Sequence, residues 1–232
     1  MIYKSLILTA DDFGQSKIGN KNILKLAKLG KIQRVAIMVN GVINSEEVKK
    51  LLEANIKLDL HLTVGRISNK DLRFKNSLNR LIRFIFLYLF GKTKTRKVLL
   101  EWEEQIQKFQ DIFSRLPDGL NSHEHIHFFP PYFKTTLVLC KKYKINFLRF
   151  GKKEVVPTSN LIGKILNFLN KINKKYFLDN EKNITSSDFL ISLDWIENLD
   201  RVVGQDIIGT IEIVCHPERE NEFRQLQNYP FL

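Results

Sequence analysis

The sequence has few cysteines and lacks the segments that direct a chain across a membrane. Its 232 residues include only two cysteines, Cys140 and Cys215, which lie far apart and have no CxxC partner. This spacing matches neither a disulfide framework nor a zinc ribbon, and it favours a reducing compartment. The first residues also lack the basic region and the long apolar run of a secretory signal. We therefore expect a cytoplasmic location.

The chain also lacks internal repeats, low-complexity blocks and Pro/Gly/Ser-rich linkers. Hydrophobic residues make up 44% of it, and a chain of this length can bury roughly 70% of its unfolded surface. These features predict a soluble globular protein with one domain over residues 1–232. The expected domain carries one insertion of apolar and basic character near residues 70–97.

Charge of one sign is in surplus, with 37 Lys and Arg against 25 Asp and Glu, a formal net charge of +12. Such a surplus can mark a nucleic-acid binder or a partner of anionic membranes. The lysines are spread over the whole chain, however, and no nucleic-acid-binding motif accompanies them. We interpret the surplus as a compositional bias and expect no nucleic-acid partner.

The insertion is the exception to this even spread of charge. Residues 78–90 read LNRLIRFIFLYLF and are followed by GKTKTRK. The apolar part is too short to span a bilayer, which takes about 20 residues. A buried helix is the interpretation that we prefer. The alternative is a peripheral membrane contact through residues 78–97, extended by a second basic helix over residues 161–175, on the inner face of the membrane.

Strand-like and helix-like segments alternate along the chain. Short apolar, β-rich runs predict strands at 2–9, 35–39, 56–60, around 120, 145–150, 189–193 and 211–215. Apolar residues at helical spacing predict helices at 17–29, 45–54 with Ser45 as the N-cap, 97–116, 132–143 and 161–177. This alternation predicts an α/β fold with a parallel sheet, either open or closed into a barrel.

Polar residues follow directly after several of the predicted strands. They are the pair Asp11 and Asp12, Asn40, His61, the histidine cluster that begins at His123, and His216. In α/β barrels the reactive groups lie on the loops at the carboxyl ends of the strands. These residues therefore predict a functional site at one end of the barrel.

The adjacent carboxylates Asp11 and Asp12 indicate a cation. One aspartate could cap a helix, but two that face the same pocket repel each other, and a bound metal ion relieves that repulsion. His61 could equally be a packed core histidine or a ligand. His216 could be a loop histidine or a general acid that gives a proton to a leaving amine.

The stretch SHEHIH, residues 122–127, contains three of the five histidines. If it were a strand, His123, His125 and His127 would point to one face. Three clustered imidazoles are hard to explain structurally, because they repel when protonated and need partners when buried. Metal ligation or contact with a polar substrate explains them better than an incidental surface cluster.

These motifs resemble those of the YdjC-like carbohydrate deacetylases, the group that includes chito-oligosaccharide deacetylases. The resemblance spans nearly the whole chain and rests on TADDFG at 9–14, MVNG at 38–41, LHL at 60–62, SHEHIH at 122–127, FP at 129–130, LR at 148–149 and CHP at 215–217. It implies a single (β/α) barrel, irregular or incomplete, related to the polysaccharide deacetylases.

The resemblance also implies a ligand set and a mechanism. Asp12, His61 and His123 would hold one divalent metal ion, with magnesium or zinc expected first and manganese or cobalt as alternatives. Asp11 would act as the base, and Arg149 would orient it. His216 would act as the acid. Asn40, His125 and His127 would contact the substrate. The implied reaction removes an acetyl group from an N-acetylated sugar, an oligosaccharide or a glycolipid, by attack of a metal-bound water.

Two other functions stay open at this point, a metal-dependent phosphoesterase and a non-catalytic barrel that binds carbohydrate or nucleic acid. A homodimer is also considered. The chain departs from the family pattern at Asn121, where many relatives carry aspartate. An amide would orient a ligand histidine more weakly than a carboxylate does.

Overall fold

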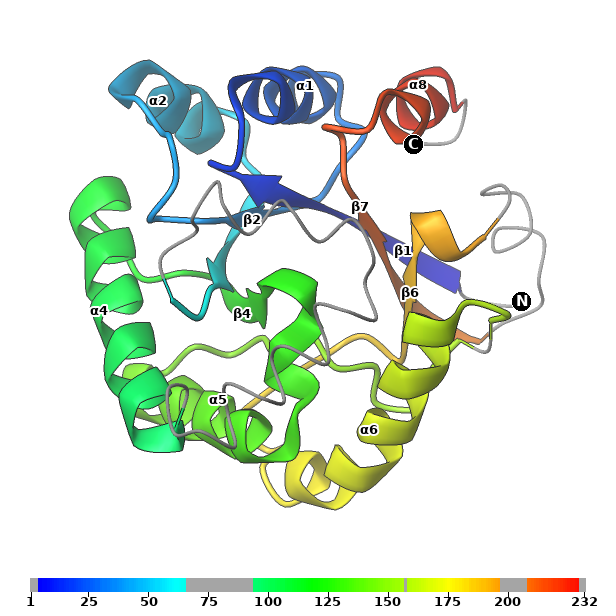
Figure 1. The fold of residues 1–232 in the computed structure, drawn as a ribbon. Helices are drawn as coiled ribbons and strands as arrows, with labels where there is room; N and C mark the ends of the chain where they lie inside the picture. Colours follow the sequence, from blue (N-terminus) through cyan, green and yellow to red (C-terminus); the bar gives the residue numbers. More distant parts are fainter. Residues whose placement is uncertain (1–3, 66–93, 157, 197–207, 230–232) are drawn as a thin grey trace.

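The structure, a computed structural model, describes residues 4–65, 94–156, 158–196 and 208–229. Its centre is a curled sheet of seven strands in the order β4-β3-β2-β1-β7-β6-β5, and every pairing is parallel (Figure 1). The strands are β1 Lys4–Phe13, β2 Arg34–Ile37, β3 Lys57–Leu62, β4 Gly119–Ser122, β5 Glu154–Val155, β6 Phe189–Ser192 and β7 Gly209–Cys215. The predicted parallel, barrel-like sheet is confirmed.

The gap between the edge strands β4 and β5 is spanned by an extended segment at residues 146–149. Leu148 forms a single parallel bridge with Leu120 of β4, and Phe147 forms another with Thr185, which precedes β6. The backbone N–H of Arg149 donates to the carbonyl of Leu120 at 3.1 Å. The prediction of a regular strand over residues 145–150 is therefore wrong: each neighbour supplies only one bridge, and the strand β5 begins later.

The helices surround the sheet, with α2, α1 and α8 over one part of the ring and α4, α5 and α6 over the rest (Figure 1). They are α1 Lys17–Lys28, α2 Ser45–Glu53, α4 Thr95–Phe113, α5 Pro130–Tyr143, α6 Leu161–Leu178 and α8 Glu220–Asn228. Two 3₁₀ segments, η2 His123–Phe128 and η3 Leu193–Trp195, follow β4 and β6. Every helix predicted within the described residues is present. All lie outside the curled sheet, as a βα alternation requires.

The N-cap predicted at Ser45 is wrong by one residue. Asn44 caps α2: its side chain accepts from the backbone N–H of Glu47 at 2.9 Å, and the Glu47 carboxylate accepts from the backbone N–H of Asn44 at 3.0 Å. This reciprocal pair is a capping box. Asn and Ser cap about equally well, so composition alone did not separate them.

The apolar core lies between the sheet and the helices. There the rings of Phe128, Phe133 and Phe177 pack around Phe150, with centroids 4.8 to 5.9 Å from its centroid. Trp102 of α4 is fully buried, and its indole N–H donates to the carbonyl of Thr63 at 3.0 Å. These contacts hold the segments that follow β3 and β4 in fixed positions.

Most of the predicted insertion at residues 70–97 lies outside the described residues, so its expected burial or membrane contact stays a prediction. Its last residues, from Thr95 on, form the first turn of α4. In the described ranges, no helix combines the length and the apolar character that crossing a bilayer requires.

Candidate metal centre

The end of β1 brings two consecutive carboxylates to the same place. In a regular strand, neighbouring side chains point to opposite faces. The register between β1 and β2 shifts between Ala10 and Phe13, and Asp12 has a left-handed backbone with φ +67°. As a result, both carboxylates reach one imidazole: Nε2 of His61 lies 3.1 Å from Asp12 Oδ1 and 3.9 Å from Asp11 Oδ2.

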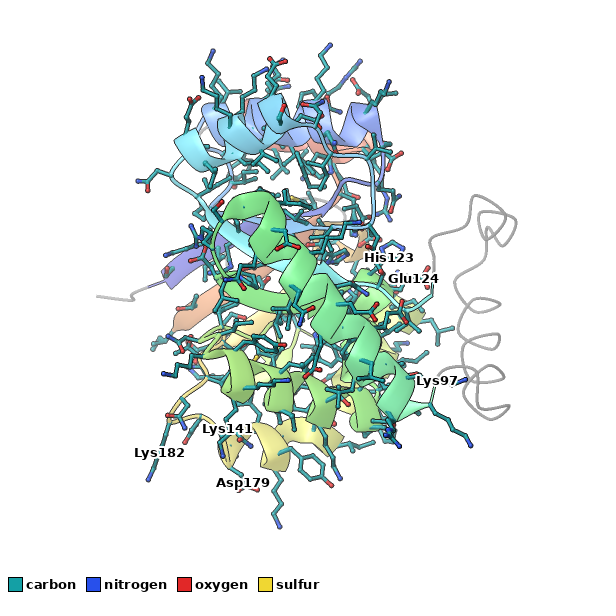
Figure 2. The ribbon with its side chains drawn as sticks, turned by 90° about the vertical axis from the view of Figure 1, so that its left-hand side faces the viewer. Lys97, His123, Glu124, Lys141, Asp179 and Lys182 are labelled. Atoms are coloured by element: carbon teal, nitrogen blue, oxygen red, sulfur yellow. The ribbon has the colours of Figure 1, made fainter. Side chains whose placement is uncertain are left out.

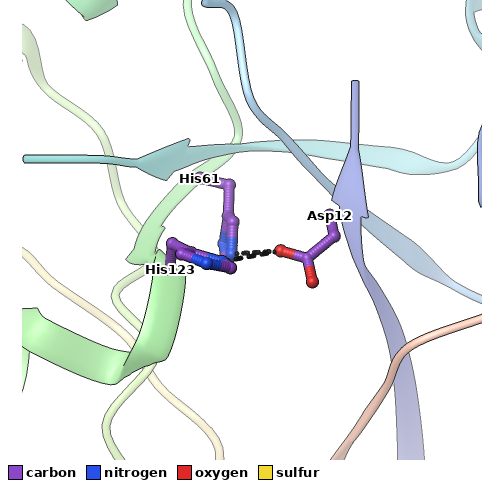
Figure 3. A group of neighbouring side chains, drawn as sticks. All are labelled: Asp12, His61 and His123. Carbon is purple, nitrogen blue, oxygen red and sulfur yellow. Dashed lines mark hydrogen bonds and ion pairs between the residues drawn. The ribbon is translucent and has the colours of Figure 1, made fainter. Parts of the chain in front are cut away.

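Asp12, His61 and His123 form one cluster at the ends of β1, β3 and β4 (Figure 3). Oδ1 of Asp12 lies 3.1 Å from Nε2 of His61 and 2.9 Å from Nδ1 of His123. The ligand atoms of the three side chains lie within 4.8 Å of one another. In Figure 2, His123 and Glu124 lie at one end of the barrel and Lys182 lies at the other. The structure thus brings together the three residues that the resemblance implies as ligands.

His61 is oriented by Asn121. The two residues are register partners in β3 and β4, and Nδ1 of His61 lies 2.5 Å from Oδ1 of Asn121. Both ring nitrogens of His61 therefore face acceptors, the Asn121 amide oxygen and the Asp12 carboxylate. A neutral imidazole carries one N–H and can serve only one of them. A cation held between Nε2 and Asp12 removes this conflict, so the residues present fit a metal ion.

The charges in the cluster favour the ionised carboxylate. Burial alone would raise the pKa of Asp12, but His123 and His61 hold it well below its usual value. Burial likewise opposes protonation of His123, yet the neighbouring Asp12 raises the pKa of His123 above its usual value. One carboxylate and two imidazoles are a ligand set that leaves coordination positions open, as a catalytic metal site requires.

Asp11 is held by the buried side chain of Arg149. Nη1 and Nη2 of Arg149 each donate to one oxygen of Asp11 at 2.7 Å, and its Nε donates to Glu212 at 2.8 Å. Arg149 and Glu212 are fully buried. Burial would raise the pKa of Asp11, but the Arg149 guanidinium outweighs it and lowers the pKa to about 2. Asp11 is therefore ionised at neutral pH.

The prediction that the three clustered histidines share one face of a strand is wrong. After His123 the chain turns, because Glu124 and His125 both have left-handed backbones, with φ +52° and +54°. His125 points instead to the Trp195 ring, with centroids 5.9 Å apart. The exposed fraction of His125 is intermediate, so of the two remaining histidines it is the one that still borders solvent.

His127 is fully buried, and both of its ring nitrogens are hydrogen-bonded. Nε2 donates to the carbonyl of Arg149 at 2.9 Å, and Nδ1 accepts from Ser122 Oγ at 2.6 Å. Burial lowers the pKa of His127 to about 3, so the ring is neutral. The ring therefore fixes the backbone of Arg149 and has no nitrogen left for a substrate.

His216 follows β7 and lies against Glu222 of α8. Its backbone N–H donates to Glu222 Oε2 at 2.7 Å, and Nδ1 lies 3.7 Å from the same oxygen. Burial would lower the pKa of His216, but Glu222, Asp12 and Asp11 raise it to about 9. A protonated imidazole near the two aspartates can serve as an acid.

Asn40 is solvent-exposed, and its amide oxygen accepts from Lys108 at 3.2 Å.

Two carboxylates that contact the candidate site residues Arg149 and His216 are not predicted from the sequence. Glu212 is fully buried in β7, in the otherwise apolar run IEIVC, and accepts from Thr9 and Arg149. A single carboxylate in a buried strand is a usable signal, because an unpaired one is costly. Glu222 lies on α8, where its sequence context is that of an ordinary surface residue.

A family model described as "YdjC-like protein" matches residues 5–230. The chain belongs to the YdjC-like family. The chitooligosaccharide deacetylase of Escherichia fergusonii is 28% identical over 228 residues, which cover 95% of this chain and 84% of that protein. The carbohydrate deacetylase of Halalkalibacterium halodurans is 27% identical over 237 residues, covering 97% and 90%.

One solved structure is similar in fold. It comes from Enterococcus faecalis V583 and is named for cellobiose-phosphate cleavage. It superposes with a TM-score of 0.63 at 18% identity, covering 92% of this chain and 80% of that one. At this identity the likeness concerns the fold alone. Together, the family match and this likeness agree with the predicted resemblance and barrel.

Proposed function

We propose that the protein is a metal-dependent carbohydrate deacetylase, which hydrolyses the amide of an N-acetylated sugar. The observation that carries the proposal is the position of Asp12 Oδ1 within 3.1 Å of nitrogen atoms of both His61 and His123. Membership of the YdjC-like family and relatives named as carbohydrate deacetylases support it. The substrate would be an oligosaccharide or a glycolipid, and the expected site of action is cytoplasmic.

Asp12, His61 and His123 would hold the ion, and their mixed oxygen and nitrogen donors suit zinc or magnesium, with manganese or cobalt as alternatives. When bound, a divalent ion polarises the acetyl carbonyl and lowers the pKa of a water molecule. The side chains around the ion would carry out the proton transfers and bind the substrate.

Asp11 is the proposed base. It stays ionised because Arg149 donates two hydrogen bonds to it, and its Oδ2 lies 3.9 Å from Nε2 of the proposed ligand His61. It can therefore accept a proton from the attacking water. His216, whose pKa is raised to about 9, gives a proton to the departing sugar amine.

Substrate contacts are proposed at the rim of the site. His125 and Trp195 form a T-shaped aromatic pair there, and both are partly exposed. Such rings can pack against the apolar face of a sugar. Asn40 is proposed as a polar contact from the segment after β2. His127 would act through the Arg149 backbone, since both of its nitrogens are already bonded.

The test combines metal content with acetate release. The variants Asp12→Asn and His123→Ala are expected to lose both the bound ion, measured by elemental analysis, and acetate release from N-acetylated oligosaccharides. Asp111→Asn, an exposed change of the same chemistry on α4, is the matched control and keeps both. Normal turnover in the two site variants contradicts the proposal. Phosphate release from sugar phosphates, without acetate release, would indicate a phosphoesterase instead.

A further inference from the structure

Helix α6 carries large apolar side chains on its exposed side and amides on its buried side. Leu161, Phe168 and Ile172 are 53%, 62% and 43% exposed and lie on one side of the helix at spacings of seven and four residues. Asn170 and Asn173 are buried, and their amides donate to backbone carbonyls of the barrel at 2.7 to 3.0 Å. Leu166 and Phe177 pack into the core on the same buried side, so α6 has apolar side chains on both its buried and its exposed side, whereas the exposed side of a surface helix is normally polar.

The charged side chains within α5 and α6 are all positive, and the first carboxylate after α6 is its C-cap, Asp179. The sequence of α6 contains four lysines and no carboxylate, and α5 contains three lysines and no carboxylate. Lys164, Lys171 and Lys175 run along one side of the stripe, and the described residues offer them no salt-bridge partner. On the other side lies Tyr176, with the ammonium of Lys134 from α5 4.3 Å from the centre of its ring.

The exposed hydrophobic residue Leu52 on α2 provides a comparison, because the charged residues of its helix are of both signs. Leu52 on α2 is 47% exposed, but its helix also carries Glu46, Glu47 and Glu53. Two lysine–glutamate pairs lie along α2, at N–O distances of 2.6 and 3.9 Å. Helix α6 has no carboxylate in its sequence, and its lysines form no ion pair with the residues that the structure describes, so their charge is available to an external anion.

We propose that this lysine–apolar face, formed by Leu161, Lys164, Phe168, Lys171, Ile172 and Lys175, docks on a membrane surface that contains anionic lipid. An amphipathic helix of this kind lies in the interface, with its apolar side chains among the acyl chains and its lysines at the phosphates. The lysine stems extend over apolar surface and keep the ammonium groups in water.

The same charges argue against the other occupants. In a symmetric dimer built on this face, the patch would meet its own copy, and the unpaired lysines would repel across the two-fold axis. Nucleic acid would use the lysines, but its phosphates would leave Leu161, Phe168 and Ile172 without an apolar partner. A lipid surface with negative headgroups offers phosphates to the lysines and acyl chains to the apolar side chains.

The face begins beside the candidate site. Thr158, three residues before α6, donates from its hydroxyl to the carbonyl of Trp195 at 3.0 Å, and the Trp195 ring contacts His125. Docking through α6 would therefore bring the His125–Trp195 rim towards the level of the lipid headgroups. The docking itself does not depend on the proposed deacetylation, and its test needs no activity.

The test is co-sedimentation of the full-length protein with vesicles. Wild-type protein is expected to bind vesicles of phosphatidylcholine mixed with phosphatidylglycerol, and to bind phosphatidylcholine alone much more weakly. The double variant Phe168→Glu/Ile172→Glu is expected to lose at least about tenfold in partition, since each change removes one inserted apolar side chain and adds a repelled charge. Leu52→Glu, on α2, is the matched control and binds as wild type.

Circular dichroism of each variant is the control for folding, and unchanged spectra are expected because the substituted side chains are exposed. Three outcomes overturn the proposal: no binding of wild type to the mixed vesicles, equal binding of wild type and the double variant, or a dimer in light scattering that the double variant splits without any vesicle binding. The second outcome would place the docking surface elsewhere in the chain. The third would assign the face to a second copy.

Discussion

Replacing Asn121 by aspartate is expected to tighten metal binding at the Asp12–His61–His123 cluster about tenfold. Asn121 is fully buried, and its amide oxygen lies 2.5 Å from Nδ1 of His61. Its amide nitrogen is buried without a hydrogen-bond partner. A carboxylate would keep the acceptor, remove the unpaired donor and place a full negative charge behind the ligand histidine.

The magnitude follows from two opposing effects. Through the imidazole, the new charge would lie about 7 Å from the ion, and at an effective dielectric of about 20 it would attract a divalent cation by about 4–5 kcal/mol. Most of this is offset because the carboxylate is buried and Asp11 and Asp12 are near. Orienting partners of metal-bound histidines change affinity by about 10–100-fold. A gain near the lower limit, about 1.4 kcal/mol, is the expected result.

The assay is competition with a fluorescent chelator, using zinc and cobalt with wild-type protein and the variant. Asn44→Asp is the matched control: it adds the same charge at an exposed helix cap where aspartate is equally suitable, and it leaves the affinity unchanged. Asn121→Ala, which frees the His61 ring, weakens binding. If Asn121→Asp binds the ion no better than wild type while remaining folded, the inferred orientation of His61 by residue 121 is refuted.

Three further predictions concern stability and pH. Arg149→Met leaves two buried carboxylates without their cation and is expected to lower the free energy of unfolding by about 3–5 kcal/mol in urea denaturation. His216, with its pKa raised to about 9, should lose the acidic proton as pH rises through that value, so acetate release falls there. Glu222→Gln moves this fall to lower pH, whereas an unmoved profile would exclude His216 as the acid. Asn44→Ala removes the α2 cap and costs about 1 kcal/mol in thermal unfolding.

The arrangement of strands and helices was predictable because the buried strands are nearly continuous apolar runs and the helices have a clear apolar period. The helix predicted at residues 17–29 is observed as Lys17–Lys28, and the strand predicted at residues 189–193 as Phe189–Ser192. Such patterns record which face of an element is buried. They do not indicate which backbone N–H and C=O groups form hydrogen bonds with a neighbouring strand. The apolar residues at 145–150 therefore predict a strand, although the segment makes only isolated bridges.

The residues around the candidate site were predictable to different degrees. Positions at strand ends and the family resemblance together identified Asp12, His61 and His123, which the structure brings into one group. The turn after His123 could not be predicted, because Glu124 and His125 adopt left-handed backbones without the glycine or asparagine that usually marks them. The alternating pattern at residues 122–127 therefore predicts a strand where the structure has a turn.

Arg149 explains why the irregular segment at residues 146–149 lies where it does. Its backbone N–H bonds to β4 through Leu120, its carbonyl accepts from His127, and its guanidinium serves Asp11 and Glu212. Closure of the barrel and orientation of the proposed base thus depend on the same residue. A lysine could not replace it, because a single ammonium group lacks the planar fork that reaches both oxygens of one carboxylate and a second carboxylate at once. The regular ladder ends at this residue because its carbonyl accepts from the His127 side chain instead of from a neighbouring strand.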